Sequence, residues 1–521
     1  MTLSDKDIEY IKNNASTVEK VKAQIELIKK GVAYSNLKRV ASIGDGILKM
    51  NPEQKTHYID VFEKRRDSLS LVKFVPASGA ATRMFKFLFN FLKKYNIEEG
   101  SINSYINKFK DNDIKVFIVG LEKLPFFEEV VHKIHEILPN FNDLNYDEKR
   151  LEFIKTMLDE DRLNYSAYPK GLLPFHRYKE HVATAFEEHL FEAAMYASSN
   201  KKAHLHFTIS EEHAHNFDKE FRFIEEDVED RTNTKFNISF SYQRKYTETI
   251  ALTDNNELCR KNDGTILFRP AGHGALLENL NELKYDLVFI KNIDNVTVLK
   301  LNEESSSYKK MLAGILLEVQ EKVFQFLLQL ENEDFSEDGL NIIVDFLSEN
   351  LNIVMSSEYH RYSKKFKIDY IKDKLNRPIR VCGMVKNEGE PGGGPFWVLD
   401  DRGKMSLQIV EFAQIDMKNP AQKELVSCAQ YFNPTDMVCS FKDYKGQWFN
   451  LEEFVDEKAV FVTSKTYNGE HIQTLELPGL WNGSMAYWNS IFVEIPLLTF
   501  NPVKTVNDLL KAPHQVTSNV Q

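Results

Sequence analysis

The chain has 521 residues, of which 42% are hydrophobic and 27% are charged, so it is an ordinary globular protein and not a disordered one. The formal net charge of -11 and the isoelectric point near 5.8 argue against a nucleic-acid-binding surface, although a local basic pocket for phosphates fits them. Four cysteines without C-x-x-C spacing favour neither a zinc ribbon nor a disulfide framework, and the expected setting is the reduced cytoplasm.

The first 70 residues are predicted to be an N-terminal helical region. Apolar side chains recur there at helical spacing, most clearly within residues 1–30. That stretch is amphipathic and polar and lacks the apolar core of a secretion signal. No run in the chain is long enough to span a membrane, so we expect no membrane partner.

Strands and helices alternate after residue 70. The patterns predict a strand at 71–75, helices over 85–165 around one short strand at 116–119, and a helix near 182–198. Further strands are predicted at 204–209, 236–242, 287–290, 407–412, 459–463 and 491–495, with helices over 300–375. This predicts one α/β domain over 71–510 with helical insertions at about 85–165 and 300–375, followed by a tail at 511–521.

Two loops in this pattern have the composition of phosphate sites. Small residues at 76–81 follow the first strand, so their backbone N–H groups can face a phosphate at a helix start, and Arg83 adds a guanidinium. Such a loop can equally be a plain connection, and it lacks the Gly-Lys-Ser/Thr ending of a P-loop. Lys170, between Pro169 and Gly171, is either an exposed turn lysine or a positioned cation.

A third segment combines a glycine-rich turn with a carboxylate. The sequence PAGHG at 270–274 enters a helix, and the apolar strand 287–290 then leads to Asp294 between two asparagines. Ligands of α/β proteins gather at the carboxyl ends of strands, which places Asp294 at the mouth of a site. Gly272 has no Cβ, so a backbone amide there can approach a ligand closely. Together these features suggest a nucleotide and a divalent ion.

Five segments taken together resemble sugar nucleotidyltransferases, and most closely the UDP-sugar pyrophosphorylases. ASGAATRM at 77–84 resembles the family's A-G-G-x-G-T-R-L signature, and PKGLLP at 169–174 resembles P-K-x-L-L-P. PAGHG at 270–274, NIDN at 292–295 and PVKTVNDLL at 502–510 resemble P-G-G-H-G, N-x-D-N and P-V-K-x-x-x-D-L-L. The segments follow the family's order, and the chain is interpreted as a bacterial branch of unknown function in that superfamily.

The resemblance implies a Rossmann-like mixed sheet of the nucleotide-diphospho-sugar transferase type with helical insertions. It also implies nucleotide-phosphate binding by Ser78 and Gly79, and catalytic roles for Arg83, Lys170 and Lys504. Serine at 78 and alanine at 81 replace family glycines, so the backbone is expected to approach the phosphates less closely.

The same resemblance implies the remaining contacts. Gln243 would read the base, and Gly272 with His273 would complete the base pocket. Glu411 and Asn433 would contact the sugar. Asp294 would bind Mg²⁺, the implied cofactor.

The implied reaction joins a nucleoside triphosphate, with UTP expected, to a sugar 1-phosphate and releases pyrophosphate. This chemistry needs positioning and charge neutralisation rather than a covalent nucleophile. One Mg²⁺ held by a carboxylate, phosphates and water, with two or three cationic side chains, can supply both. The alternatives are a non-catalytic nucleotide-sugar-binding protein and another transferase on the same scaffold.

Each of three other features has two possible interpretations. The pairs His204/His206 and His213/His215 could ligate a metal, but no carboxylate or cysteine clearly completes a zinc site, which favours structural roles. The aromatic and amide residues of 477–489 suit either a sugar or a buried turn. Lys504 is either a phosphate ligand or a surface lysine.

Overall fold

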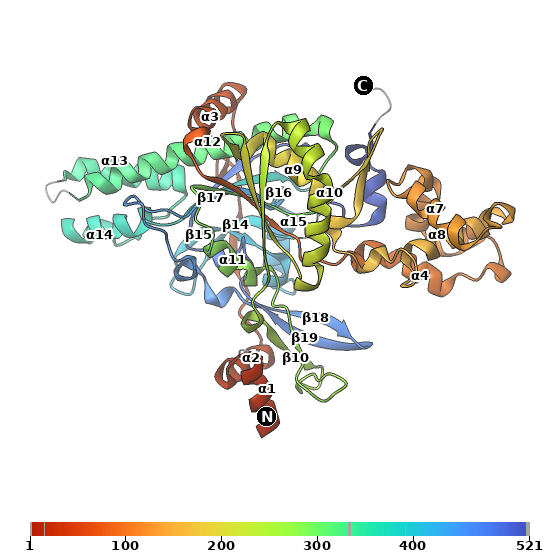
Figure 1. Ribbon diagram of the computed structural model, residues 1–521. Coiled ribbons are helices and arrows are strands. Elements are labelled where there is room, and N and C mark those ends of the chain that lie inside the picture. Colours follow the sequence, from red (N-terminus) through yellow and green to blue (C-terminus); the bar gives the residue numbers. More distant parts are fainter. Residues whose placement is uncertain (1–2, 15, 332–334, 391, 517–521) are drawn as a thin grey trace. The chain divides into compact units, whose positions relative to one another are not determined.

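The computed structural model describes residues 3–14, 16–331, 335–390 and 392–516 (Figure 1). The chain divides into two compact units, each assembled from segments that are far apart in sequence. Unit 1 comprises Met1–Phe74, Ser241–Ile290 and Ser307–Leu497, and unit 2 comprises Val75–Phe240, Lys291–Ser306 and Leu498–Gln521. Within the described ranges, no helix is both long enough and apolar enough to cross a membrane.

Unit 1 is built on a mixed sheet whose strands run in the order β2, β3, β20, β13, β17, β12 and β4. Their bounds are Ser42–Ile43, Gly46–Leu48, Asn489–Glu494, Ile379–Lys386, Asp436–Ser440, Leu287–Lys291 and Leu71–Pro76. β13 is parallel to β20 and antiparallel to β17, and β12 is parallel to β4. Every residue of β12 is buried, which is why this strand reads as a continuous apolar run rather than an alternating one.

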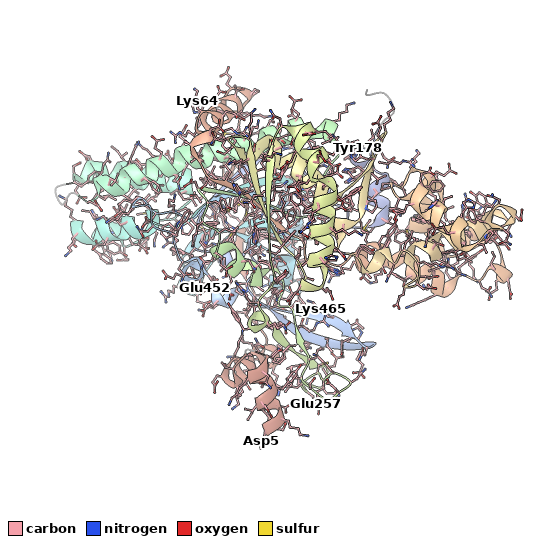
Figure 2. The ribbon with its side chains drawn as sticks, viewed as in Figure 1. Asp5, Lys64, Tyr178, Glu257, Glu452 and Lys465 are labelled. Atoms are coloured by element: carbon pink, nitrogen blue, oxygen red, sulfur yellow. The ribbon has the colours of Figure 1, made fainter. Side chains whose placement is uncertain are left out.

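Two smaller sheets complete the strands of unit 1. One has the order β1, β14, β15 and the other the order β11, β10, β19, β18. Their bounds are Asn36–Val40, Gly394–Leu399, Met405–Val410, Phe268–Arg269, Thr249–Thr253, Glu470–Glu476 and Phe461–Tyr467. Lys465 of β18, labelled in Figure 2, forms a 2.7 Å ion pair with Glu476 of β19. β16 (Tyr431–Phe432) pairs with β13.

Eight helices, one of them shared with unit 2, belong to the described part of unit 1. They are α1 (Asp5–Asn13), α2 (Val18–Lys30), α3 (Pro52–Arg65), α11 (Leu277–Asn281), α12 (Leu299–Gln329, in unit 1 from Ser307), α13 (Glu337–Leu351), α14 (Lys364–Leu375) and α15 (Pro420–Ser427). Ile11, Val21, Ile25 and Ile28 share a core with apolar residues of β10. α12 lies close to α3, since a Cβ on Gly314 would come within 1.9 Å of the Tyr58 carbonyl oxygen.

Unit 2 contains further strands and helices. β8 (Lys202–Thr208) pairs with β7 (Ser198–Ser199) and β9 (Lys235–Ser241), and β5 (Pro174–Arg177) pairs with β6 (Val182–Thr184). The helices α9 (Ala185–Tyr196) and α10 (Ala214–Thr232) pack through aromatic side chains, with the rings of Phe186 on α9 and Phe217 on α10 lying 5.5 Å apart.

A helical region makes up the rest of unit 2. It contains α4 (Lys86–Lys94), α5 (Ile102–Phe109), α6 (Asn112–Gly120), α7 (Phe127–Ile137) and α8 (Tyr146–Leu158). Its apolar core also includes Val503, Val506 and Leu509 of the C-terminal segment. That segment carries the short 3-10 helices η17 (Val506–Leu510) and η18 (Ala512–His514).

The α/β fold class with a mixed sheet and added helices is confirmed, and two local predictions are wrong. Residues 116–119 belong to helix α6, not to a strand. Asp111 caps that helix by accepting from the Ile114 N–H, while Val119 is 81% exposed, so the apolar run is not a buried strand. The first 70 residues contain strands β1, β2 and β3 as well as helices.

Candidate active site

In unit 2, Lys170 and Asp294 form an ion pair. Lys170 Nζ lies 2.8 Å from Asp294 Oδ2 and donates to the carbonyl oxygen of Val503 at 2.9 Å. The Val503 N–H in turn donates to the Asp294 carbonyl oxygen at 3.0 Å. The two side chains are 17% and 20% exposed, so the pair is open to a small ligand. Three segments that are remote in sequence therefore meet at these atoms.

The turn that carries Lys170 is held by its neighbours. A Cβ on Gly171 would lie 3.1 Å from Ile293 and 3.2 Å from Phe217, so only glycine fits there without displacing these side chains. The Lys170 N–H donates to the Gly79 carbonyl oxygen at 3.2 Å. The lysine turn and the loop at 78–83 are therefore joined through their backbones.

The loop at 78–83 follows β4 as predicted and enters the 3-10 helix η2 (Ala81–Phe85). The Ala81 N–H donates to the Tyr168 carbonyl oxygen at 3.0 Å, which continues the pairing with the lysine turn. Ser78, Gly79 and Arg83 are exposed. Their backbone and side-chain donors are therefore accessible, as a phosphate site requires.

Lys504 belongs to the same electrostatic group. Burial lowers the pKa of its ammonium; the charges of Asp294 and Asp508 oppose that shift, and those of Lys511 and Lys170 add to it. Lys170, Asp294 and Lys504 together carry one net positive charge, so the group can take up a phosphate. Lys504 is therefore electrostatically coupled to Asp294 and Lys170, whereas its contact with a phosphate stays a prediction.

In unit 1, His273 and Glu411 are hydrogen-bonded. His273 Nδ1 accepts from the Leu480 N–H at 2.8 Å, which places the imidazole proton on Nε2, 3.1 Å from Glu411 Oε1. Burial favours protonation of the Glu411 carboxyl, but the hydrogen bond and the charge of His273 hold its pKa below the ordinary value. Glu411 is therefore a carboxylate with a fixed orientation.

The segment that follows β19 forms one side of this group. The Trp481 ring stacks on His273 with a centroid separation of 4.0 Å and an interplanar angle of 10°. Gly272 has φ +81°, and a Cβ there would lie 2.7 Å from Glu476 Oε2. From the sequence, residues 477–489 could be either a sugar contact or a buried turn. The contact between Trp481 and the PAGHG turn at 270–274 joins remote segments, so the linear sequence does not indicate it.

Asn433 lies close to Glu411 through the glycine run at 392–394. The Asn433 N–H donates to the Gly393 carbonyl oxygen at 2.9 Å, and a Cβ on Gly393 would lie 3.6 Å from Glu411 Cγ. Asn433 Oδ1 accepts from the Thr435 N–H at 3.2 Å. Its Nδ2 is buried, with no hydrogen-bond partner among the described residues, so one donor is left for a ligand oxygen.

Gln243 is anchored less directly. Its Nε2 donates to Thr247 Oγ1 at 3.2 Å. The preceding residues are held by Asn279 of α11, whose Nδ2 donates to Ser241 Oγ at 2.8 Å and to the Tyr242 carbonyl oxygen at 3.0 Å. In the part of the chain that the structure describes, no hydrogen bond joins Gln243 to Gly272 or His273, so its place in a base pocket stays a prediction.

A metal would have to rely on Asp294. Across the described ranges, no group of three or more His, Cys, Asp or Glu side chains is arranged to hold a metal ion, and this applies to the His204 and His213 pairs as well. One carboxylate completed by phosphates and water is an ordinary Mg²⁺ environment. The donor set at Asp294 therefore fits Mg²⁺ better than a zinc centre.

The mixed sheets and these two residue groups define an α/β protein with a partly exposed polar site in each unit. The family model described as "Domain of unknown function (DUF4301)" matches residues 4–515, and the chain belongs to this family. No curated protein sequence matches the chain.

Solved structures with a similar chain trace include two pyrophosphorylases. A variant of the UDP-glucose pyrophosphorylase from Leishmania major, in complex with UDP-glucose, is 12% identical, with 98% of this chain and 79% of that chain covered and a TM-score of 0.44. The UDP-N-acetylglucosamine pyrophosphorylase from Trypanosoma brucei, in complex with an inhibitor, is 12% identical, with 94% and 74% covered and a TM-score of 0.46.

Proposed function

We propose that the protein is a Mg²⁺-dependent nucleotidyltransferase that joins a nucleoside triphosphate, with UTP expected, to a sugar 1-phosphate. A phosphate oxygen of the sugar 1-phosphate attacks the α-phosphorus, the bond from that phosphorus to the bridging oxygen breaks, and pyrophosphate leaves with the bond electrons. By this proposal the protein acts in the cytoplasm.

The observation that carries the proposal is the Lys170–Asp294 pair, 2.8 Å apart and partly exposed, with Lys504 coupled to it. Two ammonium groups beside a carboxylate can neutralise the charge that moves from the α-phosphorus to the leaving pyrophosphate. Lys170 is held by the Val503 carbonyl, so its position does not depend on the ligand. Bound Mg²⁺ would supply further neutralisation of the phosphate oxygens.

The other residues have separate tasks. Ser78, Gly79 and Arg83 offer exposed donors to the triphosphate. In unit 1, His273 orients the Glu411 carboxylate, which can accept from a sugar hydroxyl, while Asn433 Nδ2 can donate to one. Gln243 and Gly272 are assigned to the base.

The test is pyrophosphate release from UTP with a panel of sugar 1-phosphates, measured with Mg²⁺ and with EDTA. We expect Mg²⁺-dependent release with at least one sugar phosphate, and its loss in Lys170→Ala. Lys133→Ala is the matched control, because Lys133 forms an exposed ion pair with Glu136 on α7. Tight binding of a UDP-sugar without release by any sugar phosphate would favour the non-catalytic binding protein, and release with another acceptor would favour a different transferase.

A further inference from the structure

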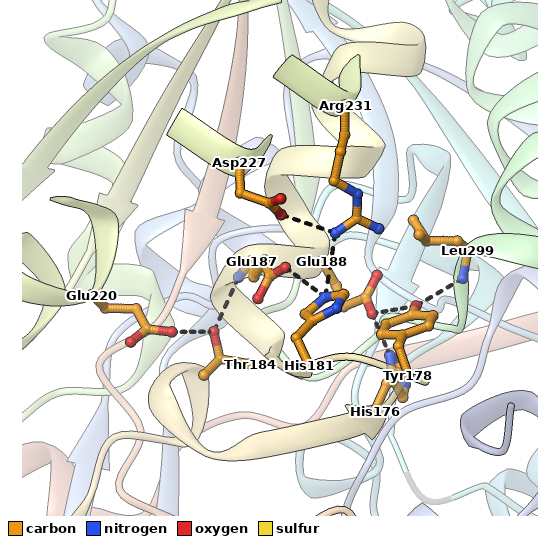
Figure 3. A network of polar contacts seen from close by, with 10 residues as sticks. All are labelled: His176, Tyr178, His181, Thr184, Glu187, Glu188, Glu220, Asp227, Arg231 and Leu299. Atoms are coloured by element: carbon orange, nitrogen blue, oxygen red, sulfur yellow. Dashed lines mark hydrogen bonds and ion pairs between the residues drawn. The ribbon is translucent and has the colours of Figure 1, made fainter. Parts of the chain in front are cut away.

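Helix α9 of unit 2 buries an unusual number of polar side chains. Ten of its twelve residues are buried, among them Glu187, Glu188, His189 and Glu192. Buried ionisable groups are unfavourable unless they are paired and hydrogen-bonded. Figure 3 shows that Glu187 and Glu188 belong to a network with side chains of the β5–β6 hairpin and α10.

Glu188 is the centre of one branch of this network. Its Oε1 accepts from the Tyr178 hydroxyl at 2.7 Å and faces His176 Nδ1 at 2.7 Å (Figure 3). The Tyr178 oxygen accepts from the Leu299 N–H at 3.0 Å. Glu188 and His176 are both fully buried, so neither side chain can exchange these partners for water.

His176 links this branch to the C-terminal segment. Its Nε2 lies 3.0 Å from Nδ1 of His514, and the two rings stack at 5.3 Å. Burial, and then the charge of His176, lower the pKa of His514 to about 3, while a hydrogen bond to the Asn501 backbone opposes the shift. A neutral His514 that donates to the Asn501 carbonyl must accept at Nδ1, so the proton of that contact belongs to His176.

The hydrogen-bond directions then follow for the whole chain of groups. His176 donates from Nε2 to His514, so the remaining proton between His176 Nδ1 and Glu188 Oε1 completes an overall neutral pair. His176 can give both bonds only while that proton is present. Glu188 therefore allows His176 to make both bonds at once, and it fixes the ring in the orientation that meets His514.

The C-terminal segment leads from His514 to the candidate active site. The Asn501 N–H donates to Asn295 Oδ1 at 2.8 Å, next to Asp294. Two residues further on, the Val503 N–H and carbonyl bond to Asp294 and Lys170. Apart from short 3-10 helices, residues 498–515 have no regular secondary structure, so such contacts fix their position.

We propose that the Glu188–His176 pair holds the C-terminal segment, residues 498–515, in place through His514. We call this arrangement of three side chains the clamp. His176, Glu188 and His514 are thus positioning residues that keep the backbone of Val503 and Lys504 beside Asp294. The catalytic consequence rests on the proposed function, whereas the clamp itself does not.

The main test uses Glu188→Gln in the full-length protein, with hydrogen exchange of peptides covering 498–515. The Tyr178 hydroxyl needs an acceptor, so the amide oxygen should take the place of Oε1. Neutral His176 then has to place its single proton on Nδ1 to bond that oxygen, which leaves no proton on Nε2 for His514. We expect exchange in 498–515 to rise about tenfold or more, with little change in α4 to α8. Glu220→Gln is the matched control, because Glu220 bonds Thr184 in the same network and has no link to His514.

Two further variants separate the bond from the volume of the side chain. His514→Ala should loosen the segment as Glu188→Gln does, and His514→Asn should recover part of the protection, because its Oδ1 can accept from His176. If Glu188→Gln does not fold, Tyr178→Phe removes one donor to Glu188 and should give a smaller effect of the same kind. Unchanged exchange in 498–515 in folded Glu188→Gln and His514→Ala overturns the clamp.

Steady-state kinetics test the catalytic consequence of the clamp separately from the hydrogen-exchange measurement. With an active wild type, Glu188→Gln should lower kcat about tenfold and leave KM for the nucleotide nearly unchanged, because Ser78 and Gly79 lie outside the clamp. A wild type that releases no pyrophosphate would refute the proposed function, and the exchange data would still decide the clamp.

Discussion

Two lysine–carboxylate pairs of unit 2 differ in environment, although Lys291 of one pair and Asp294 of the other are neighbours in sequence. Lys291 and Glu192 are 2.6 Å apart with side chains 4% and 3% exposed, whereas Lys170 and Asp294 are 2.8 Å apart and 17% and 20% exposed. Lys291 ends β12, and Asp294 lies three residues later in the turn. The same type of ion pair therefore occurs once inside the unit and once at its surface.

The difference in exposure implies a difference in role. A buried pair that loses one partner leaves an uncompensated charge in a low-dielectric environment, which is strongly destabilising. A partly exposed pair loses little, because water and ions screen the remaining charge. The Lys291–Glu192 pair should therefore be important for stability, and the Lys170–Asp294 pair for ligand chemistry.

The largest expected effect is on turnover in Asp294→Asn. The amide cannot provide the charge that would hold Mg²⁺, so kcat should fall by about a thousandfold or more while the melting temperature stays nearly constant. Pyrophosphate release measures the change in kcat, and a thermal melt measures the change in melting temperature. The control is Asp161→Asn, which replaces an exposed carboxylate. Substantial activity at ordinary Mg²⁺ would remove Asp294 from the metal site.

Glu192→Gln should have the opposite profile. Lys291 would be left buried without its carboxylate, and the free energy of unfolding should fall by about 3 kcal/mol or more. Denaturant titration measures this change, and Glu128→Gln is the control because Glu128 is 78% exposed in its contact with Arg177. A change as small as that of the control would contradict the assignment of the buried pair to stability.

Lys170→Ala and Lys504→Ala should each lower kcat about a hundredfold, which is the effect of removing one electrostatic stabiliser. Because they are coupled to the same carboxylate, the double variant should lose less than the two single variants combined. Steady-state kinetics on the singles, the double and Lys133→Ala decide this. Wild-type turnover in Lys504→Ala would show that Lys504 is a surface lysine.

Short motifs gave the charged members of the unit 2 group but not the contacts that fix them. Lys170 and Asp294 could be named because each follows a turn or strand end with a recognisable composition, and Lys504 because its segment at 502–510 resembles a family motif. The carbonyl of Val503 and the backbone bond between Lys170 and Gly79 could not, since main-chain contacts across remote segments leave no residue-type signal.

The same distinction holds elsewhere in the chain. His273 and Glu411 were expected to act on base and sugar, whereas their mutual hydrogen bond and the stacking of Trp481 depend on tertiary packing. His514 lay in the predicted tail, beyond the α/β pattern, and its link to His176 spans most of the sequence. Strands at 71–75 and 287–290 were predictable because buried parallel strands are mostly apolar. The helix at 116–119 shows that a short apolar run alone does not separate strand from helix.

The smallest expected effect is a decline of turnover at alkaline pH, which tests the charge of Lys504 beside the Lys170–Asp294 pair. Burial lowers the pKa of Lys504, so its positive charge is lost below the ordinary lysine range. Turnover should therefore decline on an alkaline limb that begins below that range. Stability should change in the opposite direction, because between the folded and unfolded pKa values the unfolded state binds more protons, and the free energy of unfolding then rises with pH.

Lys504→Arg separates this limb from other titrations. A guanidinium remains protonated throughout the accessible range, so the alkaline decline should move to higher pH, even if the maximal rate is lower because the planar group fits the site differently. Profiles of kcat against pH for wild type, Lys504→Arg and the control Lys133→Arg measure the shift. An alkaline limb in the same place in all three proteins would assign the decline to another group and leave Lys504 outside the chemistry.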